Sequence, residues 1–165
     1  MRIAVAGGTG VVGRHAVEAA RAAGHEVVVL SRSSGADVLT GAGLDERMQG
    51  ADAVIDVTNT TTLSAAKAVK FFETATRNLL AAESRAGVTH HVALSIVGID
   101  GIDASYYAGK LAQERAVAAG SVPFTIARAG QFHEFAGQLL SRMSGPVAVL
   151  PKPVSYTHLT LPTKA

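Results

Sequence analysis

Short apolar runs and longer amphipathic stretches alternate along the chain. The apolar runs are typical of buried strands and cover 2–6, 26–30, 53–57, 91–95 and 124–127. The stretches between them carry apolar residues at helical spacing and cover 11–23, 44–49, 64–86, 105–119 and 131–143. A further short strand is possible at Asp37–Leu39. This alternation predicts βαβ units with right-handed crossovers, so the expected fold class is α/β, a doubly wound Rossmann fold with a parallel sheet.

Composition adds limits on function. The chain has 165 residues, of which 48% are hydrophobic, enough for one domain with a buried core. The net charge is +2 without a block of like charges, so neither a nucleic-acid partner nor a membrane is indicated. Cysteine is absent, which excludes disulfides and thiolate metal sites. We expect a cytoplasmic protein with a small-molecule substrate and no metal; the oligomeric state stays open.

A glycine loop follows the first predicted strand. Gly7, Gly10 and Gly13 have the spacing GxxGxxG, and a predicted helix starts within the loop. Such a loop gives a dinucleotide pyrophosphate close access to backbone N–H groups at the positive end of a helix dipole. A purely structural turn is the alternative, but the order strand, loop, helix near the N-terminus favours cofactor binding.

The end of the second predicted strand bears on the choice of cofactor. An acidic residue there would hold the ribose hydroxyl of NAD, whereas a basic one would favour the extra phosphate of NADP. The chain has Ser31 and Arg32 and no acid. This favours NADP, with NAD possible, because Arg32 could also be an ordinary exposed arginine.

Three polar residues later in the chain are candidates for catalysis. Tyr106 and Lys110 are four residues apart, hence on one face of a helix, and Ser95 ends the preceding predicted strand. A nearby ammonium could lower the pKa of the phenol, and the serine could hydrogen-bond a substrate carbonyl. The alternative for the pair is a packed ring beside a solvated amine.

Together these features resemble the short-chain dehydrogenase/reductase superfamily, in its atypical or extended branch of NmrA-like NAD(P)H-binding proteins. The resemblance covers residues 1 to about 153 and includes Asn78–Ala82, Glu114 and Phe124–Arg128. It implies that Thr9, Gly10, Val11 and Val12 contact the cofactor phosphates and Arg32 the adenosine phosphate. It also implies that Val57, Thr58 and Asn59 line the cofactor, that Asp37 and Val38 flank the adenine, and that Lys110 binds the nicotinamide ribose.

The chain also departs from that family. Phe71 and Phe72 stand where many members carry an active-site asparagine, and Ala129 replaces a common proline. The leading hypothesis is an oxidoreductase that transfers hydride between NADP(H) and a carbonyl, alcohol or quinone. The alternatives are a non-catalytic NmrA-like regulator that binds NADP(H), and an NAD-dependent sugar-nucleotide epimerase, against which Arg32 argues mildly.

The last residues break the pattern. Val154–Thr163 is rich in threonine and is similar to the translation of a transposon-end adapter from sequencing libraries. We therefore expect an NAD(P)-binding Rossmann domain over 1–153, a non-native tail over 154–165, and a substrate-binding C-terminal part that is largely missing. His133, after the last predicted strand, could lie near a substrate or simply begin a helix.

Overall fold

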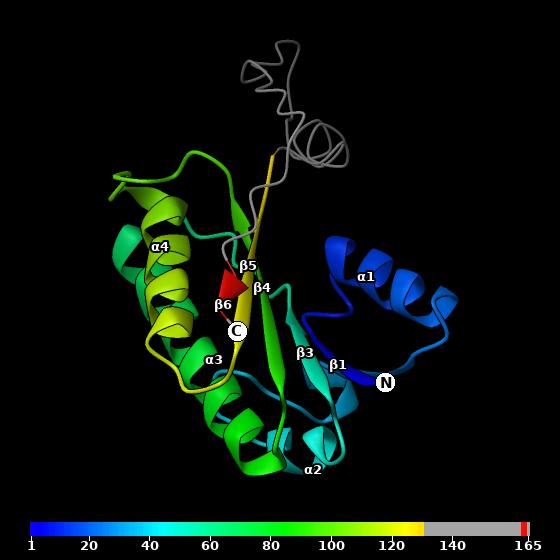
Figure 1. Ribbon diagram of the computed structural model, residues 1–165. Helices are drawn as coiled ribbons and strands as arrows, with labels where there is room; N and C mark the ends of the chain where they lie inside the picture. The colour runs from blue at the N-terminus through cyan, green and yellow to red at the C-terminus, as the bar shows by residue number, and fades with distance from the viewer. Residues whose placement is uncertain (131–162, 165) are drawn as a thin grey trace, which may run out of the picture.

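The computed structural model describes residues 1–130 and 163–164, and a mostly parallel sheet lies at its centre (Figure 1). The strands are β1 (Arg2–Ala6), β2 (Glu26–Leu30), β3 (Ala53–Asp56), β4 (His90–Ile96), β5 (Phe124–Ala129) and β6 (Thr163–Lys164). Their order across the sheet is β2-β1-β3-β4-β5-β6. Strands β1 to β5 run parallel, and β6 pairs with β5 in the opposite direction. The predicted doubly wound Rossmann fold is confirmed.

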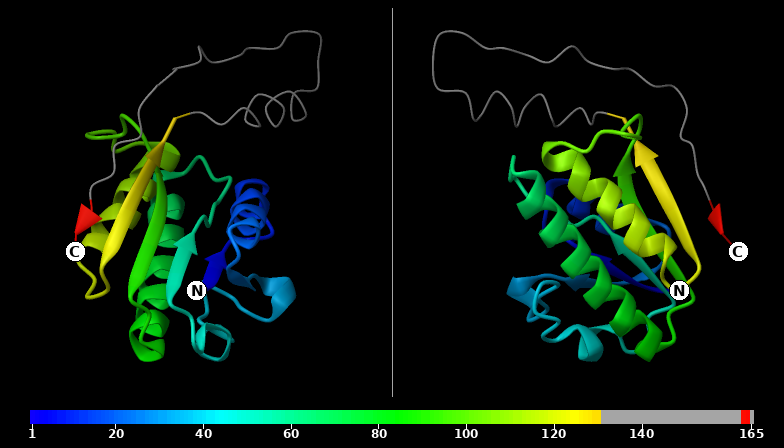
Figure 2. Two further views of the ribbon diagram at one scale, coloured as in Figure 1. Left: turned by 45° about the vertical axis from the view of Figure 1, so that its right-hand side comes forward. Right: turned by 90° about the vertical axis from the view of Figure 1, so that its left-hand side faces the viewer.

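Helices cover both faces of the sheet (Figures 1 and 2). They are α1 (Val11–Ala22), the 3-10 helix η1 (Arg32–Ser34), α2 (Leu44–Met48), α3 (Ala65–Ala86) and α4 (Ser105–Ala118). Helix α1 lies on one face, and α3 and α4 lie side by side on the other. Ser64 caps α3, because its hydroxyl accepts from the N–H of Lys67. Within residues 1–130, no helix is both long and apolar enough to cross a membrane.

The strand that was possible at Asp37–Leu39 does not form. The Asp37 carboxylate accepts from the N–H of Leu39 at 2.8 Å, which makes a local turn. The Asp37 carbonyl accepts from Gly41, and its N–H donates to the Ala42 carbonyl. Because these backbone groups are bonded within the loop, they do not pair with β2, which is the edge strand on this side.

The predicted helix over 131–143, His133 and most of the tail over 154–165 lie outside the described residues. Two tail residues form β6, where Thr163 pairs with Thr125 and Lys164 with Phe124. The division into a domain over 1–153 and a non-native tail stays a prediction.

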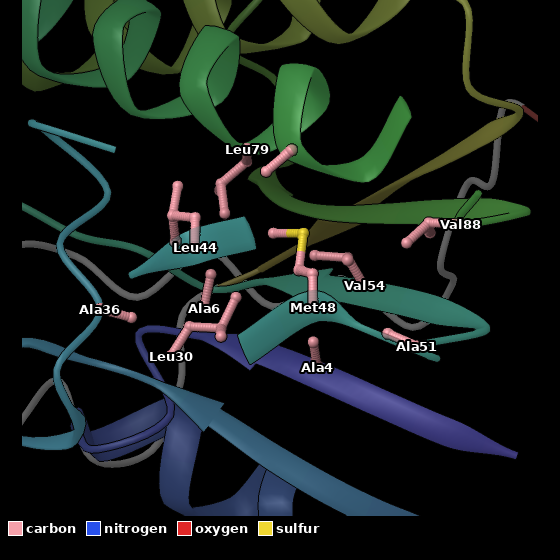
Figure 3. Close-up of a cluster of buried hydrophobic side chains, with 11 residues drawn as sticks. Ala4, Ala6, Leu30, Ala36, Leu44, Met48, Ala51, Val54, Leu79 and Val88 are labelled. Carbon is pink, nitrogen blue, oxygen red and sulfur yellow. The ribbon is translucent and has the colours of Figure 1, made fainter. Parts of the chain in front are cut away.

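The largest buried cluster lies between the sheet and α2 and α3 (Figure 3). Ala4 and Ala6 of β1 point to this face together with Val54 of β3, since Ala4 pairs with Val54 in the parallel register. The small alanine side chains leave room for Met48 of α2, which packs toward Leu79 of α3 and is fully buried. Short α2 is thus held by burial of its apolar side rather than by helix propensity.

A buried ion pair joins α3 to β4. The Nδ1 atom of His91 lies 2.8 Å from Oε1 of Glu83, and both side chains are fully buried. Burial by itself would lower the pKa of His91. The hydrogen bond to Glu83 and the charges of Glu83 and Asp56 outweigh it and raise that pKa above the ordinary value of 6.5. A raised histidine pKa stabilises the fold below 6.5, and this contribution is lost as the pH rises through the folded-state pKa.

Replacing Glu83 by glutamine should reverse this pH dependence. With the carboxylate gone, burial dominates and His91 becomes harder to protonate than in the unfolded chain. We expect the free energy of unfolding of the wild type to fall as the pH rises above about 6.5, and that of Glu83→Gln to rise as the pH approaches 6.5 from below. Urea denaturation at several pH values measures both slopes.

Glu73→Gln is the matched control, because Glu73 lies on the same helix in an exposed pair with Arg77. It should keep the wild-type slope. Parallel slopes for wild type and Glu83→Gln would show that the buried pair does not set the pKa of His91.

Candidate functional site

The candidate site lies where β1 and β3 end side by side (Figure 1). The chain leaves β1 toward α1 on one face of the sheet and leaves β3 toward α3 on the opposite face. This is the topological switch point at which open α/β sheets bind ligands. The structure brings the predicted glycine loop and the predicted segment Val57–Asn59 to this point, because Val57 N–H donates to the carbonyl of Ala6 at 3.0 Å.

Two glycines of the loop are required by the packing of the chain on itself. Gly7 has φ +78°, and a Cβ there would lie 2.8 Å from the carbonyl oxygen of Val57. A Cβ on Gly13 would lie 2.1 Å from the carbonyl oxygen of Gly7. The first turn of α1 can therefore approach the end of β1 only with glycine at both positions.

Gly10 is different, since little of the protein crowds it. It is exposed, its φ is −70°, and a Cβ would meet only the Gly7 carbonyl oxygen, at 3.2 Å. Gly10 is also the N-cap of α1, where no side chain accepts from the first turn and no acidic residue lies within it. The first N–H groups of a helix have no partner inside the helix. The cradle of exposed Thr9, Gly10 and half-buried Val11 and Val12 thus fits an anionic group.

Two hydroxyl groups at the same edge are buried without a hydrogen-bond partner among the described residues. They are Oγ1 of Thr58, after β3, and Oγ of Ser95, near the end of β4. Asp56 pairs with Ala93 in register, so the positions two residues further on lie at the same end of adjacent strands. Buried hydroxyls normally have partners. A ligand at the carboxyl edge would satisfy them.

The residues expected to determine whether the site prefers NAD or NADP lie at the end of β2. Hydroxyl groups fix the turn there: Ser31 Oγ accepts from Ser34 N–H, and Ser34 Oγ accepts from Ser31 N–H. Arg32 is exposed in this turn, and its side chain makes no hydrogen bond or ion pair with residues 1–130. Val38 is tied to α3, because Asn78 Nδ2 donates to its carbonyl at 2.9 Å. The Asp37 carboxylate is engaged in its own turn.

Tyr106 lies in the first turn of α4, directly after Ser105, which has the left-handed φ of +52° that is uncommon outside glycine. Its ring packs edge-on against Phe72 of α3, with the centroids 5.5 Å apart. Desolvation raises the pKa of Tyr106 to about 12, and the negative charges of Asp56 and Tyr107 act in the same direction. We expected Lys110 to lower this pKa, so the direction is opposite to the expectation.

Lys110 is buried one turn further along α4, and its amine is engaged elsewhere. Nζ donates to the side-chain carbonyl of Gln113 and lies 4.5 Å from the ring centre of Phe72. Burial lowers the pKa of Lys110 to about 8, against the raising effect of Asp56 and Glu114. The lysine is therefore partly deprotonated near pH 8. In its ammonium form it donates a hydrogen bond to the side-chain oxygen of Gln113.

The sequence-based reasoning missed Asp56 and Gln113. Asp56 is fully buried, and its Oδ2 accepts from Nε2 of Gln113 at 2.7 Å. An acidic residue at the last position of an otherwise apolar strand is the signal that could have found it. Gln113 offers no such signal, because an exposed glutamine on a helix is as common as a buried one that bonds a carboxylate.

Gly109 was also missed as a packing residue. A Cβ there would lie 2.7 Å from a ring carbon of Phe72 and 2.8 Å from Cβ of Ala68. Only glycine lets α4 lie this close to α3. Phe72, which stands where the resembled family often has asparagine, thereby covers the amine of Lys110 with its ring.

Arg128 lies near the end of β5, the strand beside β4. It donates two hydrogen bonds to Glu114 of α4, at 2.6 and 3.0 Å, and two to Asp100, at 2.7 and 2.9 Å. The end of β5 is thus joined to α4 and to the loop between β4 and α4. In the part of the chain that is described, no three His, Asp or Glu side chains are placed to hold a metal ion.

The model of the NAD dependent epimerase/dehydratase family matches residues 3–105. No curated protein matches the chain at a significant level. A short-chain dehydrogenase/reductase superfamily protein from Agrobacterium tumefaciens, solved with bound NAD, is 25% identical with a TM-score of 0.63; the match covers 79% of this chain and 49% of that one.

Two further solved structures are similar in fold. UDP-N-acetylglucosamine 4-epimerase from Bacillus cereus has a TM-score of 0.68 and 23% identity, over 79% of this chain and 54% of that one. Triphenylmethane reductase from Citrobacter sp., complexed with NADP(H), has a TM-score of 0.67 and 18% identity, over 82% and 52%. The chain spans about half the length of the structures it matches. The superfamily-level resemblance is confirmed; the NmrA-like branch stays a prediction.

Substitutions of the tightly packed Gly13 and of the exposed Gly10 should change the free energy of unfolding by different amounts. Gly13→Ala places a methyl group against the Gly7 carbonyl and should lower the free energy of unfolding by about 2 kcal/mol, although alanine is the better helix former. Gly10→Ala, the matched control, should cost less than about 1 kcal/mol. Urea denaturation of both variants measures the difference, and equal losses would contradict the packing argument.

Proposed function

Because the chain belongs to the NAD dependent epimerase/dehydratase family, we propose that it binds a nicotinamide dinucleotide at the carboxyl ends of β1 and β3. The observation that carries this proposal is the glycine cradle, in which Gly10 leaves the uncapped first turn of α1 open to an anion. The residues that would hold the pyrophosphate are Gly7, Thr9, Gly10, Val11, Val12 and Gly13. Val57, Thr58 and Asn59 would line the cofactor beyond β3.

The proposed cofactor is NADP(H). Arg32 is exposed, free of partners among the described residues, and fixed in a serine-capped turn at the end of β2. A guanidinium in this place suits a phosphate, because its planar donor set binds phosphate oxygens in pairs. The fold similarity to a reductase complexed with NADP(H) agrees with this choice, whereas the Agrobacterium protein was solved with NAD.

The proposed reaction is hydride transfer between NADP(H) and a carbonyl, alcohol or quinone substrate. The cofactor supplies the hydride donor or acceptor. The unpartnered hydroxyl of Ser95 would hydrogen-bond the substrate oxygen, and Tyr106 would give or take its proton. With its pKa raised to about 12, Tyr106 is protonated at neutral pH, so it would act as the donor in carbonyl reduction, as a weaker acid than an ordinary tyrosine. Lys110 would bind the nicotinamide ribose.

A specific observation favours a second function, a non-catalytic NADP(H)-binding regulator. The amine of Lys110 is bonded to Gln113, and the pKa of Tyr106 is raised rather than lowered. Both facts weaken proton transfer but leave the glycine cradle intact. A regulator predicts NADPH binding without NADPH oxidation over a broad carbonyl and quinone panel. A sugar-nucleotide epimerase, the third reading, would use NAD, which the exposed Arg32 disfavours.

Tyr106→Phe tests the catalytic role. It removes only the hydroxyl and should lower turnover by about a hundredfold or more, while the affinity for NADPH stays within about twofold. The matched control is Tyr107→Phe, which changes an exposed neighbouring ring and should leave turnover unchanged. NADPH oxidation with each variant, together with calorimetry, measures both quantities. Unchanged turnover in Tyr106→Phe would remove the tyrosine from the reaction.

Arg32→Ala tests the choice of cofactor. We expect the dissociation constant for NADPH to rise about tenfold, since one charge-assisted contact to the phosphate is lost, while that for NADH stays the same. Arg21→Ala removes an equal charge from the far end of α1 and serves as the control. Calorimetric titration of the wild type and both variants with NADPH and NADH gives the six dissociation constants. If the wild type binds NADH as tightly as NADPH, the NADP assignment is wrong.

A further inference from the structure

A buried polar chain runs from the end of β3 to α4. Oδ2 of Asp56 accepts from Nε2 of Gln113 at 2.7 Å, and Oε1 of Gln113 accepts from Nζ of Lys110. The three side chains are 0%, 1% and 3% exposed. A carboxylate, an amide and an ammonium are thus joined in sequence out of contact with water.

The direction of this chain is fixed at both ends. A carboxylate can only accept hydrogen bonds, so Gln113 must turn its NH₂ toward Asp56; an ammonium can only donate, so the amide oxygen must face Lys110. The second carboxylate oxygen of Asp56 accepts from the N–H of Thr58 at 2.9 Å. Asp56 therefore orders the end of β3 and Gln113 at the same time.

The surroundings leave Asp56 as the available counter-charge for Lys110. Glu114 of α4 also faces the lysine, but two hydrogen bonds from Arg128 engage its carboxylate. Tyr106 lies one turn before it on α4 and keeps its proton at neutral pH. From α3 the neutral ring of Phe72 faces the amine, and Asp56 faces it from β3.

We propose that Asp56, acting through Gln113, is the counter-ion that holds the charged amine of Lys110 beneath the candidate site, so that both are positioning residues. The pairing itself stands on the contacts above. Its effect on NADP(H) binding rests on the proposed function, in which Lys110 binds the ribose. Asp56 and Gln113 provide the ammonium with a counter-charge and a hydrogen-bond acceptor. Phe72 cannot replace them, because an aromatic ring offers the ammonium no hydrogen-bond acceptor of ordinary strength.

Asp56→Asn interrupts the chain without changing its shape. An asparagine has one oxygen, so either Thr58 N–H or Gln113 loses its acceptor, and turning the Gln113 amide would point its NH₂ at the ammonium of Lys110. We expect the pKa of Lys110, read from the ¹³Cε shift of ¹³C-labelled lysine in the full chain, to fall by about one unit or more. Lys110→Arg assigns the signal.

Asp52→Asn is the matched control. Asp52 lies just before β3, at the opposite edge of the sheet, and accepts from Arg2 N–H, which an asparagine can still satisfy. It should leave the pKa of Lys110 unchanged. An unchanged pKa in folded Asp56→Asn would overturn the proposal.

A second variant and a wild-type measurement cover the case in which Asp56→Asn fails to fold. Gln113→Met keeps the length of the side chain and removes both hydrogen bonds, so the pKa of Lys110 should again fall; no change would exclude the relay. In the wild type, the ¹⁵Nε2 shift of Gln113 should titrate with the same midpoint as Lys110. An amide that does not follow the lysine would overturn the proposal without any variant.

Titration with NADPH separates this proposal from the proposed function. If the pKa of Lys110 falls from about 8 to about 7, Asp56→Asn should bind NADPH about fivefold more weakly than wild type at pH 8, and equally at pH 6. A wild type that does not bind NADPH contradicts the proposed function and leaves the NMR result standing. A wild type that binds NADPH, with a Lys110 pKa that ignores Asp56, contradicts only the counter-ion.

Discussion

Successive strands of a parallel sheet are joined by crossovers that run over one face of the sheet. All the strands therefore end at the same edge. β1 to β5 obey this constraint. It places the glycine loop after β1, Arg32 after β2, Thr58 after β3 and Ser95 at the end of β4 along one line. Within residues 1–130, no hydrogen bond joins the side chains of Arg32, Thr58 and Ser95. Their common location is a consequence of strand direction, and the change of face between α1 and α3 makes room for a ligand beside β1.

Polar and charged groups are buried between the sheet and its α3/α4 layer. Asp56, His91 and Ser95 point to that face, where they meet Glu83 of α3 and Gln113 of α4. Burying an unpaired charge costs several kcal/mol, whereas a pair with complete hydrogen bonds recovers much of that cost. Asp56 accepts on both carboxylate oxygens and is joined to Lys110 through Gln113, whereas Glu83 and His91 share one hydrogen bond and leave Oε2 and Nε2 without a partner among the described residues. Since an amide or carboxylate bonds well in few orientations, these contacts also fix how α3 and α4 sit on the sheet.

Local signals in the sequence explain what could be predicted. The strands and helices follow from hydrophobic periodicity, and the loop of Gly7, Gly10 and Gly13 follows from spacing directly behind a strand. Asp37–Leu39 was misjudged because an aspartate can bond its own backbone two residues on, which periodicity does not reveal.

Asp56 and Gln113 could not have been paired from the sequence. They are 57 residues apart, and their contact depends on how closely α4 approaches α3, which Gly109 decides by having no side chain. The directions of the Tyr106 and Lys110 pKa shifts were out of reach for the same reason, because burial and the distant Asp56 contribute to both.

The catalytic and the regulatory function require different contacts of one atom, Nζ of Lys110. A lysine that stays on Gln113 contributes a buried charge and little to proton transfer at Tyr106, which suits a protein that only binds a nucleotide. A lysine drawn toward a ribose hydroxyl would leave Gln113 with an unpaired carbonyl, a cost of about 1–3 kcal/mol that the new contact must exceed. Because the pKa of this amine is about 8, a small change in its surroundings alters its charge near neutral pH. Asp56, which is joined to Lys110 through Gln113, therefore bears on whether the site can turn over a substrate.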